Sequence, residues 1–221
     1  MRALSWVTTL IFACPAYGSG MPELGVINSW LTEEDTRTFR LFAIEERKEI
    51  SLTNNESAYL VSAAMNNAGR NSMFRKALVI PQRKRVILLE ERTIKQVDSI
   101  LDLDADGTSE IVVKSSASGQ GSESGTRSIV QIDVDGSVDV LHSFEFQISN
   151  GFDWSHFSKD VKWEFLDLDG DGTRDLRETV KTTESIRGNE PTISTEKRSY
   201  LFKDSEFREE ASIPKQRNTN R

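Results

Sequence analysis

The apolar residues of this chain occur in short runs of strand length, and polar turn residues separate the runs. Branched and aromatic side chains dominate these runs, as is typical of β-strands. The runs occupy residues 39–44, 77–80, 86–89, 111–113, 128–132, 138–141 and 200–202. This pattern predicts an all-β protein built from antiparallel meanders.

The segments between the runs predict tight turns and little helix. Asp135-Gly136 is typical of a two-residue hairpin turn, whose central residues need positive φ angles. A second tight turn is expected at residues 203–205. The best helical candidates are residues 31–42 and 58–66, but neither shows a clean period of 3.6 residues.

A comparison of the chain with itself shows a weak internal repeat. We predict about three blade-like units, arranged as a partial propeller or as a sandwich. Residues 21–94 form an N-terminal β unit without an acidic loop, residues 95–211 form two repeats that each contain one, and residues 212–221 form a disordered basic tail. The Ser/Gly-rich segment 115–125 predicts a flexible hairpin loop, with a ligand-binding loop as the alternative.

The beginning of the chain has the pattern of an export signal. Arg2 supplies a positive charge, residues 3–13 are uncharged and mostly apolar, and small residues follow at 16–20. We therefore predict a signal peptide over residues 1–20 and a periplasmic or secreted protein. Cys14 ends an Ile-Phe-Ala-Cys stretch that resembles a bacterial lipobox, so the alternative is an outer-membrane lipoprotein with a lipid anchor at Cys14.

Composition narrows the possible chemistry. One Cys and two His exclude a disulfide framework and a transition-metal site rich in Cys or His within one chain. The formal net charge of −7 argues against nucleic-acid binding, which depends on cationic side chains that neutralise phosphates. After the signal peptide, no segment is apolar enough to predict a membrane span.

Two acidic loops carry the strongest chemical signal. Residues 102–110 (the first acidic loop) and 167–175 (the second acidic loop) both read Asp-x-Asp-x-Asp-Gly-x-x-Asp/Glu. The carboxylates and the carbonyl at position 7 can converge on one centre, because Gly at position 6 permits a sharp turn. Oxygen ligands at this density suit a hard cation, and calcium accepts such flexible geometry better than magnesium. The predicted calcium ligands are Asp102, Asp104, Asp106, Thr108 and Glu110 in the first loop and Asp167, Asp169, Asp171, Thr173 and Asp175 in the second.

Two alternatives concern these loops. They can be solvated acidic turns without an ion, or they can be EF-hand loops between helices. Glu178 stands at EF-hand position 12 of the second loop, whereas Val113 stands there in the first. Position 8, which is branched and apolar in EF-hands, holds Ser109 and Arg174. The apolar flanks favour a strand–loop–strand arrangement.

The loop sequence between strands resembles the calcium loop of FG-GAP/VCBS repeats, which occur in the integrin α-subunit propeller and in many exported bacterial proteins. The resemblance covers about residues 95–205 and is carried by the loops, since the Phe-Gly and Gly-Ala-Pro elements of the repeat are absent. It implies the same calcium ligands, an extracytoplasmic structure stabilised by calcium, and a role in adhesion or recognition. The resemblance does not imply an enzyme.

These features together predict an exported calcium-binding β-repeat protein, in which calcium is structural and the partner is a protein or a glycan. Residues 151–157 concentrate aromatic side chains, so Trp154 and His156 are candidates for partner contact, with core packing as the alternative. No catalytic motif is present, and we expect no enzyme. The alternative function is an envelope hydrolase or an enzyme accessory module with a pocket around His142, His156 and Trp154.

Overall fold

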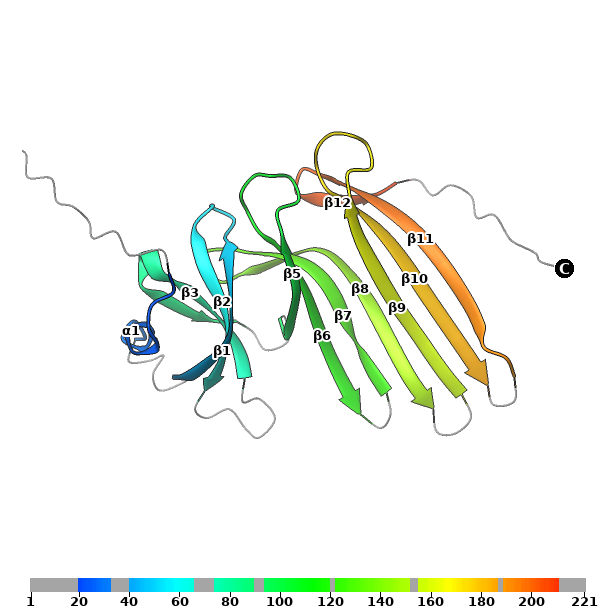
Figure 1. Ribbon diagram of the computed structural model, residues 1–221, viewed down its shortest axis with the longest axis horizontal. Helices are drawn as coiled ribbons and strands as arrows, with labels where there is room; N and C mark the ends of the chain where they lie inside the picture. The colour runs from blue at the N-terminus through cyan, green and yellow to red at the C-terminus, as the bar shows by residue number, and fades with distance from the viewer. Residues whose placement is uncertain are drawn as a thin grey trace, which may run out of the picture.

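The computed structural model describes residues 20–32, 40–65, 74–89, 94–119, 122–151, 155–186 and 189–210 (Figure 1). The described strands form two antiparallel sheets, and the order of strands in each sheet follows their order along the chain. The predicted all-β class with antiparallel meanders is therefore confirmed. Residues 1–19 of the predicted signal peptide, including Cys14, lie outside the described residues, and so do Trp154 and the predicted tail.

The first sheet has four strands and the second has eight. The four-stranded sheet contains β1 (Leu41–Ser51), β2 (Ser57–Met65), β3 (Phe74–Ile80) and β4 (Arg85–Leu88). The eight-stranded sheet contains β5 (Gln96–Leu101), β6 (Glu110–Gly119), β7 (Ser122–Ile132), β8 (Val138–Gly151), β9 (Ser155–Leu166), β10 (Asp175–Ile186), β11 (Thr192–Lys203) and β12 (Glu206–Glu209). A short helix α1 (Leu24–Asn28) precedes β1, and a single 3₁₀ turn η1 (Pro81–Arg83) joins β3 to β4.

Neither of the best helical candidates of the sequence is helical in the residues that the structure describes. The candidate at 58–66 lies in β2, whose side chains alternate between two faces. Leu60 packs into the core between the sheets, and Val61 packs on the opposite side, beside α1. This alternation has the two-residue period of a strand. The described end of the candidate at 31–42 belongs to β1.

The predicted flexible loop at residues 115–125 is wrong for the residues that the structure describes. β6 and β7 remain paired as far as Gly119 and Ser122. Polar side chains do not prevent this pairing, because backbone N–H and C=O groups make the bonds of the ladder. Gly125 permits the close approach, since a Cβ at this position would lie 2.1 Å from the carbonyl oxygen of Ser115.

The apolar side chains of the described residues pack in three clusters. The first lies between the two sheets and brings Leu60 of β2 together with Ile111 of β6. The second packs α1 against the other face of the four-stranded sheet. The third lies on the eight-stranded sheet, which curls until Phe207 of β12 reaches His142 of β8, with the ring centroids 5.7 Å apart.

The eight-stranded sheet contains two successive four-stranded meanders, β5–β8 and β9–β12. β8 and β9 pair over Gln147–Gly151 and Ser155–Lys159, near one end of the strands. β9 and β10 pair along their whole length, from Leu166 with Asp175 to Ser155 with Ile186. The joint between the two meanders is therefore held by a short ladder and by the third apolar cluster.

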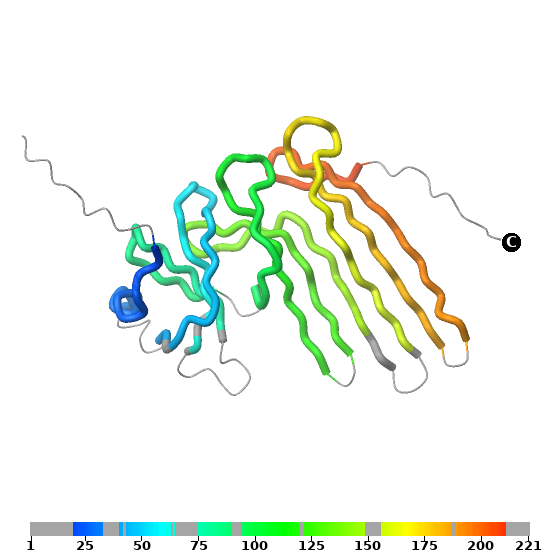
Figure 2. Tube along the Cα trace, viewed as in Figure 1, coloured from blue at the N-terminus to red at the C-terminus, as the bar shows by residue number. Residues whose placement is uncertain are grey.

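The four-stranded sheet is a third meander, and the loops that join the first two strands of the three meanders lie along one side of the molecule (Figure 2). They are residues 52–56 and the two acidic loops. Backbone hydrogen bonds link the first acidic loop to the end of β1 and the second acidic loop to the first: the N–H of Ser109 donates to the Ser51 carbonyl at 3.0 Å, and the N–H of Arg174 donates to the Leu103 carbonyl at 2.7 Å. The fold thus places both acidic loops in one connected row.

Candidate metal centre

Three carboxylates converge in the first acidic loop, between β5 and β6. Asp102, Asp104 and Asp106 each offer an oxygen that lies within 4.8 Å of the other two. The loop curls because its backbone binds the same side chains: the N–H of Gly107 donates to Asp102 Oδ2 at 3.2 Å, and the N–H of Thr108 donates to Asp106 Oδ1 at 2.6 Å. Gly107 has a φ of +88°, which side chains disfavour.

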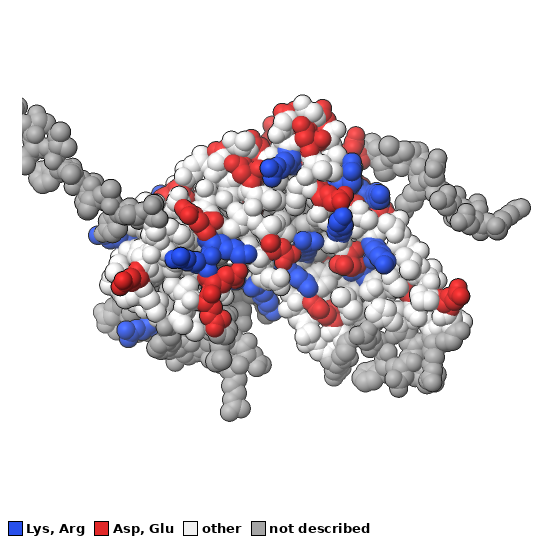
Figure 3. Space-filling model, viewed as in Figure 1, with Lys and Arg blue, Asp and Glu red and all other residues white. Residues whose placement is uncertain are grey.

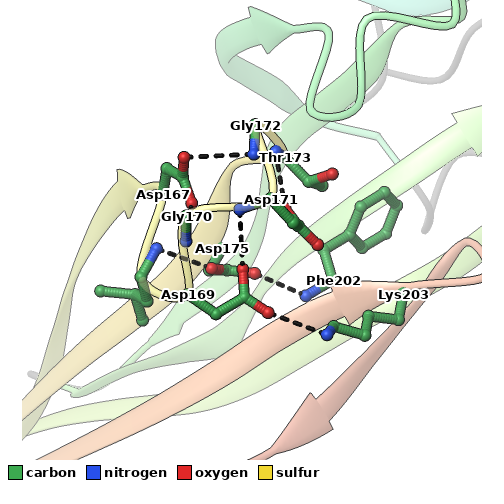
Figure 4. Close-up of polar contacts among 10 residues, drawn as sticks. Asp167, Asp169, Gly170, Asp171, Gly172, Thr173, Asp175, Phe202 and Lys203 are labelled. Carbon is green, nitrogen blue, oxygen red and sulfur yellow. Dashed lines mark hydrogen bonds and ion pairs between the residues drawn. The ribbon is translucent and has the colours of Figure 1, made fainter.

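The second acidic loop, between β9 and β10, has the same backbone curl, but the carboxylate at position 9 takes the place of the one at position 5 in the converging group (Figure 4). Oxygens of Asp167, Asp169 and Asp175 lie within 4.8 Å of one another. The N–H of Gly172 donates to Asp167 Oδ2 at 3.2 Å, the same distance as the equivalent bond in the first loop. Gly172 has a φ of +90°. Two loops far apart in the sequence therefore adopt the same curled shape.

The carboxylates at position 9 of the loops are buried and hold the loop backbone. Glu110 accepts the N–H of Leu103 at 2.7 Å, and Asp175 accepts the N–H of Leu168 at 2.8 Å. The second oxygen of Asp175 accepts the N–H of Phe202 in β11 at 2.9 Å. Position 9 consequently ties the two ends of each loop together.

Six of the eight predicted carboxylate ligands belong to the two converging groups, and Glu110 and Asp171 do not. The second oxygen of Glu110 accepts from Gln131 Nε2 at 2.7 Å. Both oxygens of Asp175 also accept hydrogen bonds, but Asp175 keeps an oxygen within 4.8 Å of Asp167 and Asp169. Asp171 accepts the N–H of Thr173 at 2.8 Å. The carbonyl oxygens of Thr108 and Thr173 stay predicted ligands, because the converging groups contain side-chain oxygens only.

Burial and mutual repulsion both disfavour the charged carboxylates of the first acidic loop. The pKa of Asp104 is raised, chiefly by burial and then by the negative charges of Asp106 and Asp102. Burial also raises the pKa of Glu110. A bound cation would relieve this repulsion, so the electrostatics of the loop favour one.

The second acidic loop already contains a positive charge from another strand. Lys203, at the end of β11, places its Nζ 2.8 Å from Asp169 Oδ2 (Figure 4). This hydrogen bond lowers the pKa of Asp169, and the same bond raises the pKa of Lys203. From the sequence, residue 203 is visible as part of a turn, but its distance of 34 positions from Asp169 gives no sign of this contact.

The donor set fits a hard divalent cation. Each group consists of carboxylate oxygens without nitrogen or sulfur, which suits calcium or magnesium and not zinc or copper. Acidic side chains gather over the row of loops in the space-filling view, with basic side chains between them (Figure 3). In the second acidic loop, the Lys203 ammonium already lies beside Asp169, so a positive charge is accommodated there.

Glu178, the predicted EF-hand position 12, does not face the second acidic loop. It is 1% exposed, and its Oε2 accepts from Trp163 Nε1 at 3.0 Å and lies 3.4 Å from His142 Nε2. Strands lie on both sides of each acidic loop. The helix–loop–helix alternative is therefore wrong, and the strand–loop–strand arrangement is observed.

Of the residues proposed for a pocket, the structure describes His142 on β8 and His156 on β9, while Trp154 lies outside the described residues. His142 packs among the rings of Trp163, Tyr200 and Phe207 on the eight-stranded sheet. His156 lies half-buried on β9. Two surface grooves of about 400 Å³ occur elsewhere, and His142 lines neither of them.

The larger groove, of about 410 Å³, lies over β7, β8 and β9, and Phe157, Lys159 and Gln147 are among its lining residues. The other lies between the start of α1 and β1. No helix in the described part of the chain has the length and apolar character that crossing a bilayer requires. Comparisons with models of protein families, with curated proteins and with solved structures find no match to this chain.

Proposed function

We propose that this chain is an exported calcium-binding β-repeat protein, in which calcium stabilises the structure and the protein binds another protein or a glycan. One observation carries the proposal: the same curled loop, with converging carboxylates, occurs twice at equivalent places between strands. Solvated acidic turns would not need this repeated convergence, because like charges at such distances repel each other. The resemblance of the loops to FG-GAP/VCBS calcium loops supports the export and recognition parts.

Calcium is favoured over magnesium for two reasons. The loops offer several carboxylates and backbone carbonyls in a flexible chain segment, and calcium accepts six to eight oxygen ligands in such geometry. Magnesium needs near-ideal octahedral geometry and keeps much of its hydration shell. Extracellular sites of this kind bind calcium with dissociation constants of about 10⁻⁴ to 10⁻³ M.

Calorimetric titration of residues 21–221 with calcium tests the proposal. We expect two bound ions per chain, and one ion in each of the variants Asp102→Asn/Asp104→Asn and Asp167→Asn/Asp169→Asn. The matched control is Asp135→Asn/Asp139→Asn, which removes two acids at a hairpin outside both groups and should leave two ions. Wild-type protein that takes up no calcium at millimolar concentration would refute the calcium part.

The recognition part has its own test. The calcium-loaded chain is applied to a glycan array, and the same array is probed in EGTA. We expect binding to a defined class of glycan that weakens when calcium is removed. Absence of any glycan binding would leave proteins as the partner class and would rule out the glycan half of the proposal.

A further inference from the structure

Lys203 is the feature that makes the two acidic loops unequal. Its Nζ lies 2.8 Å from Asp169 Oδ2, within the group of carboxylates of the second acidic loop (Figure 4). Among the described residues, no lysine or arginine forms an ion pair with the three aspartates of the first acidic loop. The two loops therefore share one shape but differ in the charge that balances their carboxylates.

The position of Lys203 is fixed by the backbone of the preceding residue. The N–H of Phe202 donates to the buried Asp175 at 2.9 Å, which docks the end of β11 onto the second acidic loop. Lys203 is the next residue, and it pairs with Glu206 of β12 across a tight turn. Its side chain is 44% exposed, so the ammonium can leave the loop for solvent without unfolding the strand.

A divalent ion and this ammonium compete for the same carboxylate. An ion that binds Asp167, Asp169 and Asp175 would lie close to the present position of the Lys203 ammonium, because the three carboxylate oxygens are within 4.8 Å of one another. Like charges at such a separation repel. Binding at the second loop therefore exchanges an ammonium for the ion, whereas binding at the first loop does not.

We propose that Lys203 is a tethered cation that balances the second acidic loop in the absence of calcium and has to be displaced when calcium binds. This inference rests on the proposed calcium function. It implies that the first acidic loop fills at lower calcium concentration than the second, so that the two sites respond over different ranges of calcium. It also implies that the second loop keeps its shape when calcium is low.

The test uses Lys203→Gln in a chain whose first loop is disabled by Asp102→Asn/Asp104→Asn, so that calorimetry reports the second loop alone. We expect Lys203→Gln to tighten calcium binding by about two- to five-fold, the range that loss of one competing exposed ion pair allows. The matched control is Lys162→Gln. It removes a lysine with the same 2.8 Å ion pair, to Glu164 on β9, which belongs to neither group of carboxylates, and should not change the affinity.

A second readout does not depend on affinity. In EGTA, Lys203→Gln should lower the melting temperature more than it does in calcium, because the variant loses the internal cation only when no ion replaces it. Lys162→Gln should have the same effect in both conditions.

The outcomes separate the two proposals. Weaker calcium binding in Lys203→Gln would show that the lysine supports the bound ion and would overturn the competition. Equal binding in Lys203→Gln and Lys162→Gln would overturn it as well, while leaving the calcium function intact. Failure of the parent chain to bind calcium would overturn both.

Discussion

Replacing Asp175 with Ala should destabilise the protein by about 2–4 kcal/mol, even in EGTA. The side chain is fully buried and accepts two backbone N–H groups, from Leu168 and Phe202. Each buried donor left without an acceptor costs about 1–3 kcal/mol, and partial relaxation reduces the total. Urea denaturation of the variant and the wild type in EGTA measures the effect without any contribution from an ion.

Asp171→Ala is the matched control for this substitution. Asp171 lies in the same loop but is exposed, and it accepts the N–H of Thr173. Its loss should cost less than about 1 kcal/mol, because water can take over the hydrogen bond. Equal destabilisation by the two substitutions would contradict the assignment of Asp175 as the residue that ties the loop to β11.

Replacing Glu178 with Ala should cost about 2–4 kcal/mol at pH 7. The buried carboxylate binds Trp163 and His142, and Arg198 lies 3.7 Å away, so truncation leaves a buried indole N–H unpaired and removes the partner of His142 and of the Arg198 guanidinium. It also opens space in the third apolar cluster. Chemical denaturation at pH 7 measures the loss.

The part of the Glu178 contribution that depends on its charge should be lost in acid. Burial raises the pKa of Glu178, but hydrogen bonds from His142 and Trp163 and the nearby charges of His142 and Arg198 outweigh it and set the folded pKa below the ordinary 4.5. A lowered folded pKa gives stability that is present above pH 4.5 and is lost as the pH falls toward the folded value. The difference in stability between wild type and Glu178→Gln should therefore shrink as the pH drops below 4.5.

Glu164→Gln is the control for the pH series. Glu164 is a half-exposed residue on β9 that pairs with Lys162 at the surface, so its removal should leave stability almost unchanged at pH 7. A stability difference for Glu178→Gln that stays constant between pH 7 and pH 3 would contradict the ionised state of the buried carboxylate.

The acidic loops could be predicted from the sequence because their geometry is local. The spacing of Asp and Gly fixes the curl, which the structure shows in both loops. It does not fix which carboxylates converge, since these are positions 1, 3 and 5 in the first loop and positions 1, 3 and 9 in the second. The all-β class could also be predicted, because apolar residues occur in short runs of strand length, such as 128–132. By contrast, β6 and β7 extend through 115–119 and 122–125 with almost no apolar residues, so hydrophobic pattern alone gave no strand there.

The contacts that the sequence did not predict all join distant residues. Lys203 reaches Asp169 because β11 lies beside β10, and Glu178 meets His142 because the eight-stranded sheet curls. Glu110 was predicted as a ligand, yet its carboxylate is bound by Gln131 from the next strand. Spacing along the chain cannot reveal which of several nearby acids the surrounding strands will engage.

The connected row of loops explains how an ion in one loop can stabilise more than that loop. The first acidic loop is bonded to the end of β1, and the second is bonded to the first. The joint between β8 and β9 is a short ladder, so the loop row is a second tie between the two meanders. We expect calcium to stabilise the joint as well as the loops.

The most direct test of the central claim is a thermal melt of residues 21–221 in EGTA, in 1 mM calcium and in 1 mM magnesium. With a dissociation constant near 10⁻⁴ M, each site adds about 1.4 kcal/mol, so two sites should raise the melting temperature by about 5–10 °C. We predict a much smaller rise in magnesium, and a calcium-induced rise about half as large in Asp167→Ala/Asp169→Ala. Identical melting temperatures in EGTA and in calcium would contradict the account, because the acidic loops would then be solvated turns.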